Sequence, residues 1–175
     1  MIDGKTFAYV SQFLNNRTIQ VRVGDKLSTT HVLENGTPQG SIISPLLFLI
    51  MINDLPTDLT DTETTLFADD SCLFKSGRNL DVILRKMQNS LNKLADWCDI
   101  NGFKISMDKT VAVLFTHRRE QTNRILKIND EALTVKSHAK FLGIIFDSKL
   151  TWNDHVNYTV DKCKKTNKSV ASSSW

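Results

Sequence analysis

Residues 64–74, TTLFADDSCLF, form two short runs of mostly strand-forming residues on either side of Ala68-Asp69-Asp70. β-Branched and aromatic residues favour strands and aspartate is common in turns, so the pattern predicts a hairpin with two carboxylates at its tip. Carboxylates held close together repel each other unless a cation neutralises them, and oxygen ligands at an exposed tip suit Mg²⁺. Asp69 and Asp70 are therefore candidate metal ligands, although an aspartate-rich turn is the simpler explanation of the pair taken alone.

Upstream of this hairpin, short predicted helices and strands alternate, which indicates an α+β fold. Apolar residues at helical spacing predict a helix over 7–14. Alternating residues over 18–23 predict a half-buried strand that turns at Gly24-Asp25 and pairs with a second strand near 29–33. The second strand leads into a loop over 35–40 that contains two glycines.

A helix over 44–55 is expected after that loop. Ser44 should act as its N-cap, because its hydroxyl can accept a hydrogen bond from a free amide of the first turn. Pro45 should take the first helical position, where the backbone N–H that proline lacks would have no partner in the helix. Apolar residues cover most sides of this helix, so we expect it to be buried on nearly every face.

Downstream of the hairpin, apolar residues at spacings of three and four predict a strongly amphipathic helix over 80–98. Asn101-Gly102 is its expected left-handed end. The rest of the chain should form short strands and a last helix: a strand over 111–115, a hairpin of 125–128 with 132–135 around Asn129-Asp130, a strand over 141–146, and a helix from about Asn153.

The composition fits one globular domain, since 175 residues of which 41% are hydrophobic can form a packed core. Lys and Arg number 22 against 19 Asp and Glu, and the excess lies in residues 149–175. A basic face there could meet phosphates, and an ordinary solvated helix face is the alternative. Cys72, Cys98 and Cys163 are too far apart for a zinc motif and odd in number, which favours a reducing compartment. No apolar run is long enough to cross a bilayer, so we expect no membrane partner.

Four motifs in a specific order resemble the reverse transcriptases of non-long-terminal-repeat retrotransposons, group II introns and retrons, with the jockey-like branch most similar. The resemblance covers most of the chain. The motifs are GTPQGSIISPLLF at 36–48, FADD at 67–70, GFKI at 102–105 with DKT at 108–110, and KFLGI at 140–144 with LTW at 150–152 and His155.

This resemblance implies the palm of a right-hand polymerase, a twisted antiparallel sheet backed by the helices 44–55 and 80–98, with the beginning of a helical thumb. The expected domains are a partial palm over 1–137, a primer-grip hairpin region over 138–150 and a truncated start of the thumb over 151–175. The fingers and the first palm strand of the family, with its Phe-Asp motif, have no counterpart before Gly4. We therefore expect a fragment that lacks the first catalytic carboxylate and is inactive when isolated.

The resemblance also assigns roles to single residues. Asp69 would be the main metal ligand, with Asp70 beside it, and Lys109 would protonate the leaving pyrophosphate. The remaining assignments are Pro38, Gln39 and Gly40 to the template base and incoming nucleotide, Phe141, Leu142 and Gly143 to the primer grip, and Lys162, Lys164, Lys165 and Lys168 to the nucleic-acid backbone.

Simpler explanations stand beside several of these roles: an ordinary turn at residues 38–40, a surface lysine at 109, and a buried strand with a closely packed glycine at 141–143. Glycine at position 40 is expected because a side chain would block a close approach of the backbone to its ligand. One departure from the family is Ser106, where asparagine is usual.

The implied activity of the parent protein is RNA-directed DNA polymerisation with two Mg²⁺ ions during retrotransposition, in the cytoplasm and nucleus. The implied partners are an RNA template, a DNA primer, deoxynucleoside triphosphates and the rest of a polyprotein, with fingers and an endonuclease as candidate neighbours. The alternatives are a degenerate or repurposed fragment that binds nucleic acid without catalysis, and a translated remnant with no stable fold.

Overall fold

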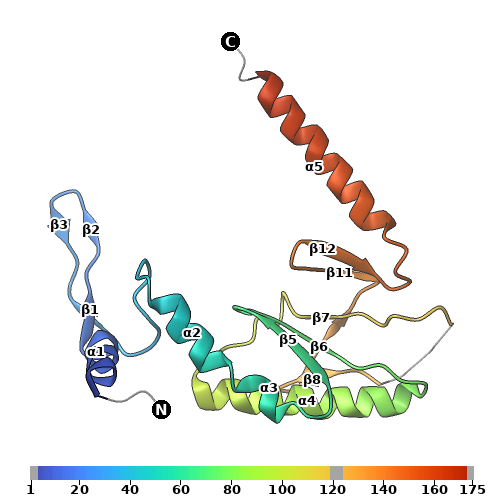
Figure 1. The fold of residues 1–175 in the computed structure, drawn as a ribbon, viewed down its shortest axis with the longest axis horizontal. Coiled ribbons are helices and arrows are strands. Elements are labelled where there is room, and N and C mark those ends of the chain that lie inside the picture. The colour runs from blue at the N-terminus through green and yellow to red at the C-terminus, as the bar shows by residue number, and fades with distance from the viewer. Residues whose placement is uncertain (1–3, 119–123, 173–175) are drawn as a thin grey trace. The chain divides into compact units, whose positions relative to one another are not determined.

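The computed structural model describes residues 4–118 and 124–172, with side chains described as far as Thr166. The chain divides into two compact units, Met1–Asp54 and Leu55–Trp175. Both units contain helices and short strands (Figure 1), as expected for an α+β chain. No helix in the described ranges is long and apolar enough to cross a membrane.

The first unit consists of two helices and two small antiparallel strand pairs. β1 (Arg17–Ile19) pairs with β4 (His31–Leu33), as expected. β2 (Arg22–Val23) pairs with β3 (Lys26–Leu27) across a turn in which Gly24 has φ +61°. The predicted strand over 18–23 is interrupted, because Ser28 Oγ accepts a hydrogen bond from the Val21 amide over 3.0 Å. The elements are α1 (Gly4–Leu14), β1 (Arg17–Ile19), β2 (Arg22–Val23), β3 (Lys26–Leu27), β4 (His31–Leu33) and α2 (Ser44–Ile52).

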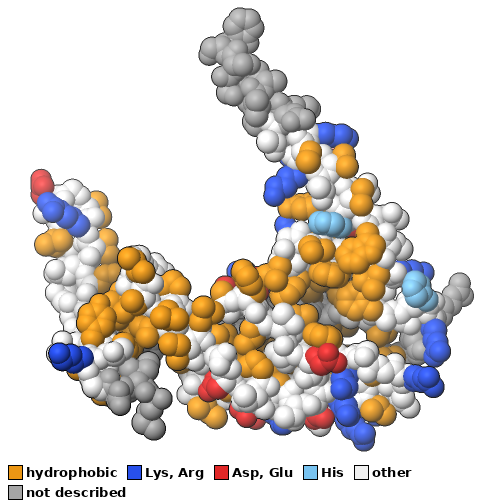
Figure 2. Space-filling model, viewed as in Figure 1, with side chains coloured by type: hydrophobic (Ala, Val, Ile, Leu, Met, Phe, Trp, Pro, Cys, Tyr) orange, Lys and Arg blue, Asp and Glu red, His pale blue; other side chains and the backbone are white. Residues whose placement is uncertain are grey.

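Helix α2 differs from expectation, since its apolar side chains are largely exposed (Figure 2). Only Ser44 and Ile52 are buried, whereas Leu46 and Ile50 are 58% and 52% exposed. Burying a helix on every face needs neighbours on every side, and residues 4–54, as the structure describes them, contain only α1 and four strands of two or three residues besides α2. The prediction of a helix buried on nearly every face was therefore wrong for this structure.

The second unit is organised around its longest helix, α4. The carboxamide oxygen of Asn79 caps the start of α4 by accepting a hydrogen bond from the Val82 amide over 3.2 Å. Gly102 ends the helix at φ +71°, as predicted, and Phe103 folds back onto Trp97 with ring centroids 5.3 Å apart. The elements are α3 (Leu55–Asp58), β5 (Glu63–Phe67), β6 (Asp70–Phe74), α4 (Leu80–Asn101), β7 (Val111–Ala112), β8 (Lys127–Ile128), β9 (Glu131–Ala132), β10 (Thr134–Val135), β11 (His138–Phe141), β12 (Ile144–Asp147) and α5 (Asn153–Ser172).

The core of the second unit lies along one face of α4. Leu55, the first residue of α3, is 2% exposed, and Leu59, just after α3, is 1% exposed. Helix α3 contacts α4. The buried residues of α4 are Ser90, Leu91, Leu94, Ala95, Trp97 and Cys98, and Ile128 and Leu133 complete the core. This apolar stripe confirms the amphipathic helix predicted from spacing.

The strands pair differently from the single twisted antiparallel sheet that we expected. Those in the described ranges form six two-stranded sheets, and β7 with β10 is a parallel pair. Most pairs form between segments close in the chain, where loop closure costs little entropy. The predicted strand over 111–115 is reduced to β7, and the predicted strand over 141–146 is divided by a turn at Leu142-Gly143.

Candidate functional site

The β5–β6 hairpin places Asp69 and Asp70 at its tip, as the sequence predicts. Phe67 pairs with Asp70, which leaves Ala68 and Asp69 as the two turn residues. Both aspartates are exposed. Ala68 has φ +50°, a left-handed conformation that costs a non-glycine residue about 1–2 kcal/mol. This positive φ belongs to the two-residue turn that puts Asp69 at the tip.

The base of the hairpin is anchored to α4. Thr62 Oγ1 donates a hydrogen bond to Ser90 Oγ over 2.9 Å, and both residues are buried. Thr64 and Leu66 in β5 and Leu73 in β6 are half-buried. The hairpin is therefore held at its base while the carboxylates at its tip remain accessible.

The donor atoms at the tip suit a hard divalent cation. Carboxylate oxygens are the ligands that Mg²⁺ prefers, and Mg²⁺ commonly takes one or two carboxylates together with water and substrate phosphates. Within residues 4–118 and 124–166, no three His, Cys, Asp or Glu side chains gather into a metal-binding group. The hairpin thus offers two carboxylates, Asp69 and Asp70, and not a complete protein cage.

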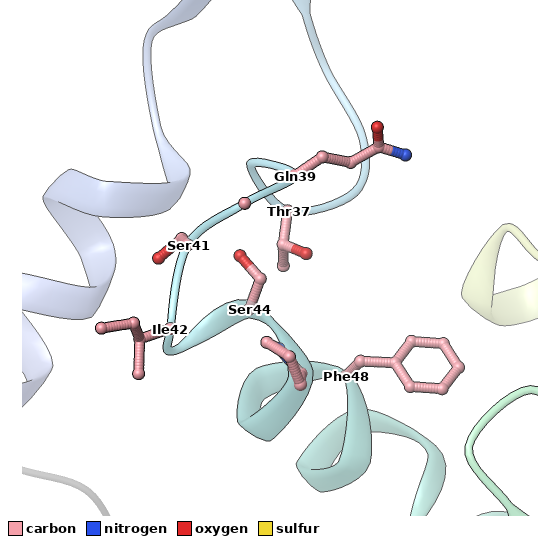
Figure 3. Close-up of a pocket in the computed structure, with 8 residues that line it drawn as sticks. Thr37, Gln39, Ser41, Ile42, Ser44 and Phe48 are labelled. Atoms are coloured by element: carbon pink, nitrogen blue, oxygen red, sulfur yellow. The ribbon is translucent and has the colours of Figure 1, made fainter. Parts of the chain in front are cut away.

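The loop Pro38-Gln39-Gly40 lies beside an open cavity of about 470 Å³ (Figure 3). Thr37 and Ser44 point toward one another there, whereas the Gln39 side chain extends outward. Ser44 Oγ donates a hydrogen bond to the Pro38 carbonyl over 2.7 Å, which ties the loop to the first residue of α2. Ser44 is therefore not the N-cap that we predicted; Ile43 holds that position without a side-chain hydrogen bond.

The backbone conformation at Gly40 favours glycine by itself. A Cβ atom at this position would meet nothing within 4 Å, so no close approach within the chain excludes a side chain. Its φ of +87° lies in a region that other residues rarely adopt. The backbone turn is therefore one sufficient reason for the glycine, and the expected close approach to a ligand stays a prediction.

Lys109 lies in a compact turn that begins at Ser106. The Ser106 carbonyl accepts hydrogen bonds from the Lys109 amide over 3.1 Å and from the Thr110 amide over 3.0 Å. The Lys109 side chain is exposed, so its ammonium is accessible from solvent. Ser106 shapes this turn through its backbone, which explains how serine can replace asparagine there without loss of the turn.

Phe141, Leu142 and Gly143 form the end of β11 and the turn into β12. Leu142 and Gly143 have φ of +47° and +85°, a two-residue hairpin turn of the kind that matches strand twist. Phe141 is half-buried and Leu142 is exposed. A Cβ at Gly143 would meet nothing within 4 Å, so the turn geometry, and not close packing, explains this glycine.

Two features near this hairpin were missed by the sequence analysis. Lys140 Nζ donates a hydrogen bond to Tyr158 Oη over 2.7 Å and lies 4.4 Å from the centroid of its ring. That hydrogen bond, together with the positive charges of Lys140 and Lys162, lowers the pKa of Tyr158 below its ordinary value. This contact joins β11 to α5. In the sequence, the one indication of it is that Tyr158 lies one helical turn after His155.

The second missed feature is Asp147, at the end of β12. Hydrogen bonds from backbone amides, that of Thr151 above all, hold the pKa of the Asp147 carboxyl below its ordinary value. His155 Nδ1 accepts a hydrogen bond from the Ile145 amide over 3.4 Å. These contacts attach the start of α5 to the β11–β12 hairpin.

The lysines predicted to bind nucleic-acid backbone lie on α5. Lys162, Lys164 and Lys165 are exposed, while the side chain of Lys168 lies outside the described residues. The structure thus brings the predicted primer grip and the start of the predicted thumb together. Asp69 and Asp70 belong to a separate strand pair, and Pro38, Gln39 and Gly40 belong to the first unit.

Comparisons with known proteins agree with the motifs. Residues 2–146 match the family described as "Reverse transcriptase (RNA-dependent DNA polymerase)". The chain is 30% identical over 165 residues to the probable RNA-directed DNA polymerase from transposon BS of Drosophila melanogaster, covering 90% of this chain and 18% of that protein. In the same organism it is 26% identical to the RNA-directed DNA polymerase from mobile element jockey, over 97% of this chain and 19% of the relative.

A further Drosophila melanogaster relative, the probable RNA-directed DNA polymerase from transposon X-element, is 29% identical over 86% of this chain and 17% of the relative. The chain therefore spans less than a fifth of the length of these three relatives. No solved structure matches it.

Proposed function

This chain belongs to the reverse transcriptase family, and from that membership we propose that it is the part of a retrotransposon RNA-directed DNA polymerase that holds the catalytic metal ions. The parent protein would extend a DNA primer on an RNA template. One observation carries the proposal: Asp69 and Asp70 are exposed together at the tip of a hairpin whose base is anchored to α4.

Asp69 and Asp70 would hold two Mg²⁺ ions together with carboxylates from elsewhere in the parent protein. When bound, these ions stabilise the entering and leaving oxygens of a phosphoryl transfer. The hairpin contributes position, because a buried hydrogen bond holds its base while its tip carries the two carboxylates.

The loop Pro38-Gln39-Gly40 would lie against the template base and the incoming nucleotide. The outward side chain of Gln39 supplies both hydrogen-bond donors and an acceptor, and the hydrogen bond from Ser44 to Pro38 holds the loop in place. Lys109, which is exposed, would carry the proton that the leaving pyrophosphate takes up.

The β11–β12 hairpin would hold the 3′ end of the primer, and α5 would follow the backbone of the duplex. The contact between Lys140 and Tyr158 supports this pairing of roles, because it joins the hairpin to the helix. Lys162, Lys164 and Lys165 are exposed and can meet phosphates without reading sequence.

The isolated chain should not extend a primer, because its described residues supply only part of a metal site. A chimera tests both statements. The matching segment of the transposon BS relative would be replaced by residues 1–175, and extension of an oligo-thymidylate primer on polyadenylate would be measured with Mg²⁺. We expect activity from the chimera and none from the isolated chain.

In an active chimera, Asp69→Ala should reduce primer extension at least about a hundredfold, since it removes a charge that acts at the reacting phosphate. Asp25→Ala is the matched control, because Asp25 is another exposed aspartate in a hairpin turn, between β2 and β3. Equal activity of the two variants would remove the metal-ligand assignment.

The exposed lysines of α5 favour a second candidate, a fragment that binds nucleic acid without catalysis. A chimera that binds a primer–template with normal affinity but incorporates no nucleotide, while the intact relative is active under the same conditions, would favour this function over the first.

A further inference from the structure

A cavity of about 320 Å³ opens beside the first turn of α4, outside the four motifs of the family. Three basic side chains line it, those of Lys75, Arg78 and Lys86. Lys75 and Lys86 are half-buried and Arg78 is exposed. Lysine stems commonly lie on apolar surface while the ammonium group stays in water, and Ile83 supplies such a surface in this cavity.

The charge around this cavity is not balanced. Residues 75–88 contain one acidic side chain, Asp81, and its Oδ1 atom is 3.1 Å from Nε of Arg124. In the part of the chain that the structure describes, no carboxylate lies within ion-pair distance of any of the three lining cations. Figure 2 shows basic side chains gathered toward the beginning of α4, where residues 75–88 contain Lys75, Arg78, Arg85 and Lys86.

The shape of the cavity is set by the turn before α4. A Cβ atom on Gly77 would lie 3.3 Å from Cγ1 of Ile83, so the backbone at Gly77 packs directly on that side chain. Asn79 fixes the other end of the turn through its hydrogen bond to the Val82 amide. This turn therefore places Lys75 and Arg78 on the same cavity as Lys86.

We propose that this cavity binds backbone phosphates of a nucleic-acid strand. Three cations with no carboxylate partner among the described residues form a favourable site for phosphate. Sequence-independent contacts of this kind supply most of the affinity in non-specific binding. The inference goes beyond the proposed function, because it adds a contact outside the motifs and requires no metal ion.

The test uses the full 175-residue chain, a labelled single-stranded oligouridylate and a chelator, with binding followed by fluorescence anisotropy across salt concentration. The triple variant Lys75→Gln, Arg78→Gln, Lys86→Gln should bind about tenfold more weakly. Its plot of log affinity against log salt should be shallower by about 2, since each phosphate contact on a single strand contributes about 0.7. An unchanged slope would overturn the proposal.

A matched control variant removes three positive charges at positions outside the cavity. Lys26, Lys127 and Lys136 are exposed and lie outside the cavity, so their replacement by glutamine should leave the slope near that of the unaltered chain. An equal loss in this control would show a general charge effect and would also overturn the proposal. The single change Arg78→Glu, at an exposed position, keeps the test open if the triple variant does not fold.

A competition experiment distinguishes two possible ligands of the cavity, a nucleic-acid strand and a small phosphate compound. Inorganic phosphate and a deoxynucleoside triphosphate would each be titrated against the bound oligonucleotide, with concentrations expressed per phosphate. We expect both to compete poorly with unlabelled oligouridylate. Competition as strong as that of the oligonucleotide would assign the cavity to a small phosphate compound and reject a strand. None of these outcomes depends on primer extension, so failure here leaves the proposed function standing.

Discussion

The carboxylate of Asp147 accepts a hydrogen bond from the Trp152 backbone amide over 2.8 Å, across the loop that joins β12 to α5. The same carboxylate accepts from the amides of Lys149 and Thr151 and from the Thr151 hydroxyl. Leu150 and Trp152 both have positive φ, so this loop is strained. The hydrogen bonds to Asp147 therefore stabilise the strained loop from which α5 begins.

Asp147 should make the stability of this region depend on pH. Because its folded-state pKa is lowered, its stabilisation is present above the unfolded-state pKa of about 3.9 and is lost as pH falls through the folded-state value. Asp147→Asn should lower the melting temperature near neutral pH, and the difference from the unaltered chain should shrink as the solution is acidified. Thermal unfolding monitored by circular dichroism measures both. Asp130→Asn, at an exposed turn position, is the control, and a difference that is constant with pH would contradict the prediction.

The contact of Lys140 with Tyr158 should be visible in a titration. The chain has two tyrosines, so in a Tyr9→Phe background the absorbance of tyrosinate reports Tyr158 alone. Lys140→Met should raise the pKa of Tyr158, because the hydrogen bond and positive charge that lower it are both removed. Lys162→Met should raise it less, since only a charge effect is lost. If neither substitution moves the titration curve, the contact does not persist in solution.

Replacing Gly143 by asparagine should lower the free energy of unfolding less than replacing it by alanine. Its φ of +85° disfavours alanine by about 1–2 kcal/mol, while asparagine tolerates left-handed backbone. No steric effect confuses the comparison, since a Cβ at this position would meet nothing within 4 Å. Urea unfolding of the two variants gives the difference, and equal stabilities would show that the turn has another conformation.

The core along α4 predicts a strong effect at Leu59, which is 1% exposed. Leu59→Ala should lower the free energy of unfolding by about 2–5 kcal/mol, because it removes buried methyl groups and leaves a cavity. Leu142→Ala is the matched control. Because Leu142 is 45% exposed, this variant should lose well under half as much free energy of unfolding as Leu59→Ala. Similar losses at both positions would mean that α3 does not pack on α4 in solution.

Several features could be predicted from residues close together in the chain. The β5–β6 hairpin, the ends of α4 and the start of α5 depend on turn residues, caps and apolar spacing, all of which are local. The order of the motifs pointed to the family in the same way, because each motif is a short contiguous segment. Such signals are present in the chain before it folds.

Other features depend on which groups meet after folding. The hydroxyl of Ser44 could cap α2 or bond to the Pro38 carbonyl, and the conformation of the preceding loop selects the second. The pairing of β7 with β10, the contact of Lys140 with Tyr158 and the cavity bounded by Lys75 and Lys86 join groups on different elements. Their strength comes from distance and burial, which no local pattern of residues specifies.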